Sequence, residues 1–127
     1  MTRISVSSAK AKGRRLQQDI ARRISELVGM PCGKDECIES RPMGQSGTDV
    51  RLSTEARALF PFSVETKASE AWDVPGAIRQ AKANVYDGTD WLVVMKKSRE
   101  VPVAILDAEV LFKILEQLQR LKRTRTI

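Results

Sequence analysis

The chain contains a strand, a helix and a second strand in immediate succession, a pattern that limits the folds open to it. The run WLVVM (91–95) is continuously apolar, as is typical of a strand covered on both faces. The segment FSVETK (62–67) is an earlier strand, and the residues between predict a helix with Asp73 as N-cap and Pro75 in its first turn. Strands joined by a crossover helix form a parallel pair with a right-handed connection. The sequence therefore predicts a sheet that contains a parallel pair.

The rest of the chain supplies further elements around this unit. We expect an amphipathic helix at 8–28, alternating strands at 36–40 and 48–52, a helical turn at 53–60, a strand at 101–106 and a final helix from Asp107 to about Arg123. The order of the main elements is α, β, β, β, α, β, β, α, which predicts an α/β protein of the α+β type, with helices packed on a mixed sheet. At 127 residues the chain fits a single domain, 1–127, with a basic tail from about residue 120.

Each of the three main helices carries an apolar stripe and is expected to bury it on the sheet. The stripes are Leu16, Ile20, Ile24, Leu27 and Val28, then Val74, Ile78, Ala81 and Val85, and finally Val110, Leu111, Ile114, Leu115, Leu118 and Leu121. Gln17 falls inside the first stripe, which indicates an inward-facing group. The last stripe is wide, with Phe112 on its rim. Core packing explains most of it, and the surplus could serve dimerisation.

The formal net charge is +6, from 22 Lys and Arg against 16 Asp and Glu. The basic residues gather in the first helix, in the turn after WLVVM and in the tail, which favours a polyanionic partner, although solubility alone is the alternative. The candidate phosphate contacts are Lys10, Lys12, Arg14 and Arg15 in the helix and Lys96, Lys97 and Arg99 in the turn. We expect a cytoplasmic protein without a membrane span or secretion signal, since no apolar run reaches the roughly 20 residues that a span needs.

Cysteine and histidine usage excludes several kinds of chemistry. Cys32 and Cys37 are the only cysteines and the chain has no histidine, so a closed zinc site lacks ligands. The cysteines are expected to be reduced, structural thiols. Catalytic arrangements that pair histidine with serine or cysteine are also excluded.

The end of the strand at 62–67 carries charge. Glu65 and Lys67 are two residues apart, so they project from the same face, and Asp49 on the neighbouring strand points away from the core-facing Val50 and Leu52. Two carboxylates without histidine or thiolate suit Mg²⁺ or Mn²⁺. Lys67 should stay protonated between them and orient water or stabilise a charged transition state. By itself, the Glu and Lys pair could equally be a solvated surface pair.

The order of elements and four segments resemble the PD-(D/E)XK nuclease superfamily, especially the small Holliday junction resolvases of the archaeal and phage type. The segments are KGRRLQQDIARRI (12–24), RPMGQSGTDV (41–50), SVETK (63–67) and RQAKAN (79–84), and their order covers nearly the whole chain. The resemblance implies a restriction-endonuclease-like core. It further implies that Asp49, Glu65 and the backbone carbonyl of Thr66 are metal ligands, that Lys67 is the lysine of the motif and that Gln80 is the glutamine of the following helix.

Two positions depart from the family pattern. Thr48 replaces the proline before the first acid, and Gln17 replaces the acid that many members carry in the first helix, which removes one negative charge from the metal site. Gln17 could still accept a hydrogen bond or bind through its amide oxygen, or it could simply lie at the helix boundary. Members often place a serine before the first acid, and Ser40 and Ser46 are both candidates here, although either could be only a turn former.

The resulting prediction is a Mg²⁺-dependent or Mn²⁺-dependent endonuclease, a homodimer that acts on branched DNA, most of all four-way junctions, in the cytoplasm, or in the host cytoplasm if a phage encodes it. One alternative is a nuclease of the same fold that acts on flap, linear or other duplex DNA in phage or bacterial DNA metabolism. A second is a non-catalytic basic DNA-binding module, and a third is a structural protein that binds a partner through its last helix. Aromatic residues are few, which argues against stacking of single strands.

Overall fold

A computed structural model describes residues 6–42 and 47–125 of the chain. Its elements are α1 (Val6–Val28), β1 (Ile38–Ser40), β2 (Val50–Leu52), α2 (Thr54–Leu59), β3 (Phe62–Ala68), α3 (Val74–Ala83), β4 (Asp90–Lys96), β5 (Val103–Leu106) and α4 (Ala108–Arg125). The predicted helical turn is α2, whose N-cap Ser53 accepts a 3.1 Å hydrogen bond from Ala56 N. All other predicted elements are present, so the observed order differs from the predicted one only by this short helix.

The strands form a mixed sheet and a separate hairpin. β3 and β4 pair in parallel, with Glu65 opposite Val93, and β5 pairs antiparallel with β4. The α+β class with a mixed sheet is therefore confirmed. β1 and β2 form their own antiparallel pair and are not strands of this mixed sheet. The two units meet where Asp49 N donates a 3.0 Å hydrogen bond to Val64 O.

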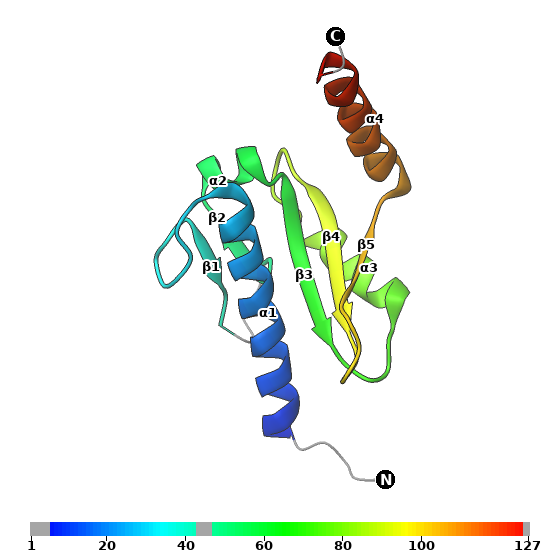
Figure 1. Ribbon diagram of the computed structural model, residues 1–127. Coiled ribbons are helices and arrows are strands. Elements are labelled where there is room, and N and C mark those ends of the chain that lie inside the picture. The colour runs from blue at the N-terminus through cyan, green and yellow to red at the C-terminus, as the bar shows by residue number, and fades with distance from the viewer. Residues whose placement is uncertain (1–5, 43–46, 126–127) are drawn as a thin grey trace.

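Helices cover both faces of β3 and β4 (Figure 1). On one face, Leu16 and Ile24 of α1 form a core with Val64, Val94 and the buried side chains of the hairpin. On the other face, Ala77 and Ala81 of α3 pack on Val93 and Met95. Val93 and Val94 are thus buried on opposite faces, which confirms the prediction made from the continuous apolar run.

Two details of the predicted helix faces are wrong. Leu27 is 73% exposed, because the last turn of α1 packs Val28 against the core instead. In α3 the buried residues are Ala77 and Ala81, whose small side chains suit a close approach of the helix to the sheet. Val85 lies beyond the end of α3 and is exposed.

The largest departure concerns α4. The stripe along this helix was expected to pack mainly in the core, yet none of its residues is buried. Figure 1 shows why, since α4 follows β5 and extends away from the rest of the molecule. Within the described ranges no helix combines the length and apolar character that crossing a membrane requires.

Candidate metal and nucleic-acid site

Asp49 lies at the edge of β3 that is not paired with β4. Its Oδ2 atom accepts hydrogen bonds from Thr66 N at 2.7 Å and from Thr66 Oγ1 at 3.2 Å. The main-chain N–H of Thr66 would bond to a carbonyl of the neighbouring strand if β2 ran along β3. Here the carboxylate of Asp49 accepts this hydrogen bond instead. Before it, buried Thr48 donates from Oγ1 to Val50 O at 3.0 Å, which holds the turn that presents Asp49. Thr48 thus supports this turn at the position where the nucleases that the sequence resembles carry a proline.

Glu65 is the buried acid of the site. It is only 2% exposed, and within the described part of the chain its Oε2 atom is buried without a hydrogen-bond partner. Burial and, after it, the charge of Asp49 raise the pKa of Glu65 to about 7, while the charge of Lys67 opposes the rise. Asp49 accepts its hydrogen bond from Thr66, the residue after Glu65, so the structure brings the two carboxyl groups into one region.

Lys67 lies beside Glu65 on the face covered by α3. Its Nζ atom is 3.7 Å from Glu65 Oε1 and donates a 2.7 Å hydrogen bond to Gln80 Oε1. Gln80 is exposed on α3 and, with Lys67, lines an open pocket of about 300 Å³. The predicted neighbours Glu65, Lys67 and Gln80 are therefore brought together, and the glutamine fixes the ammonium group at the rim of this pocket.

The donor set fits a hard divalent cation. In a strand the N–H and C=O of one residue point to the same edge, so the carbonyl of Thr66 faces the same side as its N–H, toward Asp49. Two carboxylates and one carbonyl are ligands that Mg²⁺ accepts while it retains several waters. In the described ranges no three acidic, thiol or imidazole side chains form a metal cluster, so two acids are what this site offers. The unpartnered oxygen of Glu65 is the atom that a cation would satisfy.

Gln17 of α1 meets Ser40, the last residue of β1, in the strand pair next to Asp49. Gln17 is 5% exposed, and its Oε1 accepts a 3.2 Å hydrogen bond from Ser40 Oγ. The next residue, Arg41, donates its N–H to Asp49 O at 2.9 Å. Gln17 is thus inward-facing, as predicted, and its oxygen bonds to the residue before Arg41, which holds the main chain of Asp49. Ser46, the other serine candidate, lies outside the described residues.

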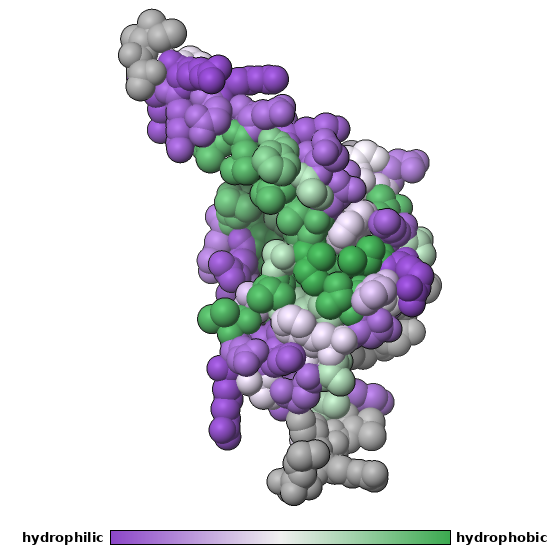
Figure 2. All heavy atoms as spheres, turned by 90° about the vertical axis from the view of Figure 1, so that its right-hand side faces the viewer, coloured by the Kyte–Doolittle hydropathy of each residue, from purple (hydrophilic) through white to green (hydrophobic). Residues whose placement is uncertain are grey.

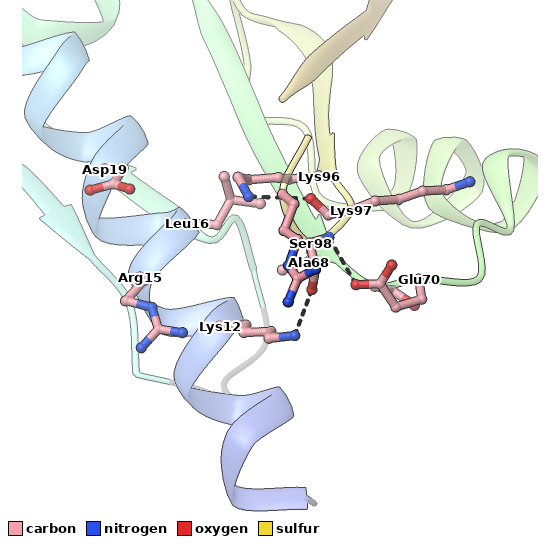
Figure 3. A pocket seen from close by; sticks show the side chains of 11 residues that line it. Lys12, Arg15, Leu16, Asp19, Ala68, Glu70, Lys96, Lys97 and Ser98 are labelled. Carbon is pink, nitrogen blue, oxygen red and sulfur yellow. Dashed lines mark hydrogen bonds between the residues drawn. The ribbon is translucent and has the colours of Figure 1, made fainter. Parts of the chain in front are cut away.

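A basic pocket lies next to the carboxyl end of β3, between α1 and the turn that joins β4 to β5 (Figure 3). Its volume is about 430 Å³. Five of the predicted phosphate contacts line it, namely Lys12, Arg15, Lys96, Lys97 and Arg99, together with the acids Asp19 and Glu70. We call this surface the basic pocket. It gathers cations from segments more than 80 residues apart, since Lys12 Nζ donates a 2.6 Å hydrogen bond to Ser98 Oγ with a separation of 86 residues.

Two residues of the basic pocket, Ser98 and Glu70, were not anticipated from the sequence. Ser98 links its two walls, because it accepts from Lys12 and its main-chain N–H donates to Glu70 Oε1 at 2.8 Å. Hydrogen bonds from Ser98 lower the pKa of Glu70. Only the turn pattern around Ser98 could have drawn attention to it.

Trp72 packs with the α3 core, and Lys97 Nζ lies 5.0 Å from the centre of its ring.

The remaining predicted phosphate contacts lie on another side of α1. Lys10 and Arg14 line a separate open pocket with Ser40 and Arg41. The basic side chains of α1 thus form two groups. Lys12 and Arg15 lie next to the β4–β5 turn, and Lys10 and Arg14 lie next to the end of β1. The cysteines are both free, with Cys37 against the core and Cys32 exposed.

No protein-family model matches this chain, and neither a curated protein nor a solved structure matches it significantly. The likeness to PD-(D/E)XK nucleases therefore rests on the residues of the site and on the order of the elements that hold them.

Proposed function

We propose that this protein is a divalent-metal-dependent endonuclease that hydrolyses phosphodiesters in branched DNA, with four-way junctions as the preferred substrate. The observation that carries the proposal is the buried carboxyl group of Glu65 beside Asp49 and Lys67, whose Oε2 has no hydrogen-bond partner among the residues that the structure describes. An acid whose pKa is raised by burial and by a neighbouring carboxylate is a frequent feature of catalytic sites. A structural ion pair would not need a second acid at this position.

Each residue of the site has a separate task. Asp49, Glu65 and the Thr66 carbonyl would hold Mg²⁺ or Mn²⁺, and Thr66 N–H keeps the Asp49 carboxylate directed to the edge of β3. A bound cation of this kind polarises the phosphate and makes bound water more acidic. Lys67 is held by Gln80 with its positive charge at the rim of the site, where it can orient the attacking water and stabilise negative charge on the phosphate.

The basic pocket supplies the contacts for the nucleic-acid backbone. It is adjacent to the site, because Ala68 and Ser69 line it and follow Lys67 directly in the chain. Phosphate contacts of this kind bind without regard to base sequence, so selectivity would come from the shape of the DNA. Cations on two sides of α1 suit a substrate whose arms diverge, which favours a junction over a linear duplex. The proposed place of action is the cytoplasm, or the host cytoplasm if a phage encodes the chain.

The test is a cleavage assay on labelled four-way, flap, duplex and single-stranded DNA, each with Mg²⁺, with Mn²⁺ and with EDTA. We expect cleavage only with metal and fastest on the four-way junction. Asp49→Asn, Glu65→Ala and Lys67→Ala should each abolish cleavage while DNA binding persists. Arg23→Ala is the matched control, since Arg23 is exposed on α1 away from the described pockets.

The outcomes separate the alternatives. Full activity in EDTA, or wild-type rates in the Asp49 and Lys67 variants, would refute the proposed chemistry. Metal-dependent cleavage that prefers flap or linear DNA would keep the chemistry and refute the junction substrate. Salt-sensitive DNA binding with no cleavage and no calorimetric metal binding would identify a non-catalytic DNA-binding module.

A further inference from the structure

α4 presents an apolar stripe to solvent. Leu111, Ile114, Leu118 and Leu121 recur at intervals of three and four residues, so they lie on one face of the helix. Each of them is at least 40% exposed, and no residue of α4 is buried. Figure 2 shows hydrophobic atoms over the lower part of α4 that continue onto the adjoining body of the molecule. We call these four side chains the α4 stripe.

A helix in this situation lacks the usual source of stability. In globular proteins most helical stability comes from packing an amphipathic face against the rest of the structure. α4 has 18 residues and buries none of them on its own chain. A continuous apolar surface of this kind is typical of an interaction site. The α4 stripe therefore needs a partner.

The charges at the two ends of the stripe indicate which partner fits. Asp107 lies four residues before Leu111, and Arg125 lies four residues after Leu121, so an acid and a base extend the stripe at opposite ends. Consider two α4 helices that run antiparallel and cross at Glu116. The facing pairs are then Leu111 with Leu121, Ile114 with Leu118 and Asp107 with Arg125.

A parallel pair would instead place each end charge against its own copy. Asp107 would face Asp107 and Arg125 would face Arg125, which is unfavourable. The antiparallel arrangement also sets the positive end of each helix dipole beside the negative end of the other. The end charges of the stripe are thus complementary in the antiparallel orientation, in which the same patch of each copy meets about a two-fold axis.

We propose that α4 docks against α4 of a second copy of this chain, as an antiparallel pair about a two-fold axis. The pairing covers the α4 stripe on both copies and places Asp107 of each beside Arg125 of the other. It depends on the α4 stripe and its end charges, not on the proposed nuclease site.

Sedimentation velocity of the full chain tests the association. We expect a dimer at micromolar concentration for the wild type and for Gln119→Asp, and a monomer for Leu118→Asp. The two substitutions put the same residue at neighbouring positions of one exposed helix, so they cost similar helix propensity, but only Leu118 lies in the stripe. Circular dichroism melting checks that the body stays folded. A monomeric wild type, or a dimer that Leu118→Asp leaves intact, would overturn the proposal and indicate another occupant.

Crosslinking tests the orientation. Leu111→Cys and Leu121→Cys are prepared separately in a background with Cys32→Ser and Cys37→Ser, and each is oxidised alone and in an equal mixture. The antiparallel pair predicts a disulfide dimer in the mixture and little in either single variant. Dimers that form in each single variant, with no additional product in the mixture, would show a parallel pair and refute the proposed arrangement.

Discussion

The main-chain N–H of Thr66 donates a 2.7 Å hydrogen bond to the carboxylate of Asp49, 17 residues earlier in the chain. Asp49 directly precedes β2, and Thr66 lies in β3, so this bond links the β1–β2 hairpin to the mixed sheet. It also holds one acid of the site next to the strand that carries the other, Glu65. The same contact thus serves the fold and the proposed chemistry.

Substitutions of Asp49 should separate these two roles. Asp49→Asn keeps an oxygen that can accept from Thr66 N–H, so its stability should stay near that of the wild type, while cleavage is lost. Asp49→Ala leaves that N–H without its partner, and we expect it to be less stable by about 1–3 kcal/mol. Urea unfolding of the two variants measures the difference. Equal stability of the alanine and asparagine variants would contradict the structural role.

Stability of the metal-free protein should fall as the pH rises from about 4.5 to about 7. The pKa of Glu65 is raised from 4.5 to about 7, so the folded state holds the proton more tightly than the unfolded chain does. The favourable contribution of the protonated carboxyl is fully present below pH 4.5 and is lost by about pH 7, at a cost of about 3 kcal/mol.

The matched variant is Glu65→Gln, which stays neutral throughout. Between roughly pH 5 and pH 8, the range around that pKa, its free energy of unfolding should change less than that of the wild type. Added Mg²⁺ should also reduce the loss in the wild type, because it favours the carboxylate. Parallel pH profiles for the two metal-free proteins would show that Glu65 does not titrate in this range.

Gln80 should act by positioning Lys67. Gln80→Leu removes the acceptor of the 2.7 Å hydrogen bond, and we expect single-turnover cleavage to slow about tenfold, the rate equivalent of roughly 1.4 kcal/mol. Gln80→Glu offers an oxygen at the same distance and should restore most of the rate. DNA affinity should change little in both variants. A fall in affinity with an unchanged cleavage rate would assign Gln80 to DNA binding instead.

The basic pocket should control the salt dependence of DNA binding. Arg15→Ala and Arg99→Asn remove one cation each, and asparagine is chosen because Arg99 has a φ of 63°, which asparagine tolerates. If each residue contacts a phosphate, the slope of log affinity against log salt should decrease by about 0.9 per substitution. Arg23→Ala should leave the slope unchanged. Slopes that do not differ from that control would exclude the pocket from the DNA interface.

Local patterns in the sequence determined most of the secondary structure. The alternation around Glu65 and Lys67, the continuous run over Val93 and Val94 and the cap at Asp73 all predicted the observed β3–α3–β4 unit. They could do so because strand and helix periodicity, capping and the crossover rule depend on neighbouring residues. The common face of Glu65 and Lys67 follows from the same two-residue repeat.

Only the tertiary structure decided which distant segments meet. It set Asp49 against Thr66, Gln17 against Ser40 and Lys12 against Ser98, and it separated the β1–β2 hairpin from the sheet. It also left α4 outside the core, although its stripe is as regular as that of a buried helix. The periodicity of apolar residues predicts that a helix has an apolar face. Which surface covers this face depends on where the rest of the chain packs.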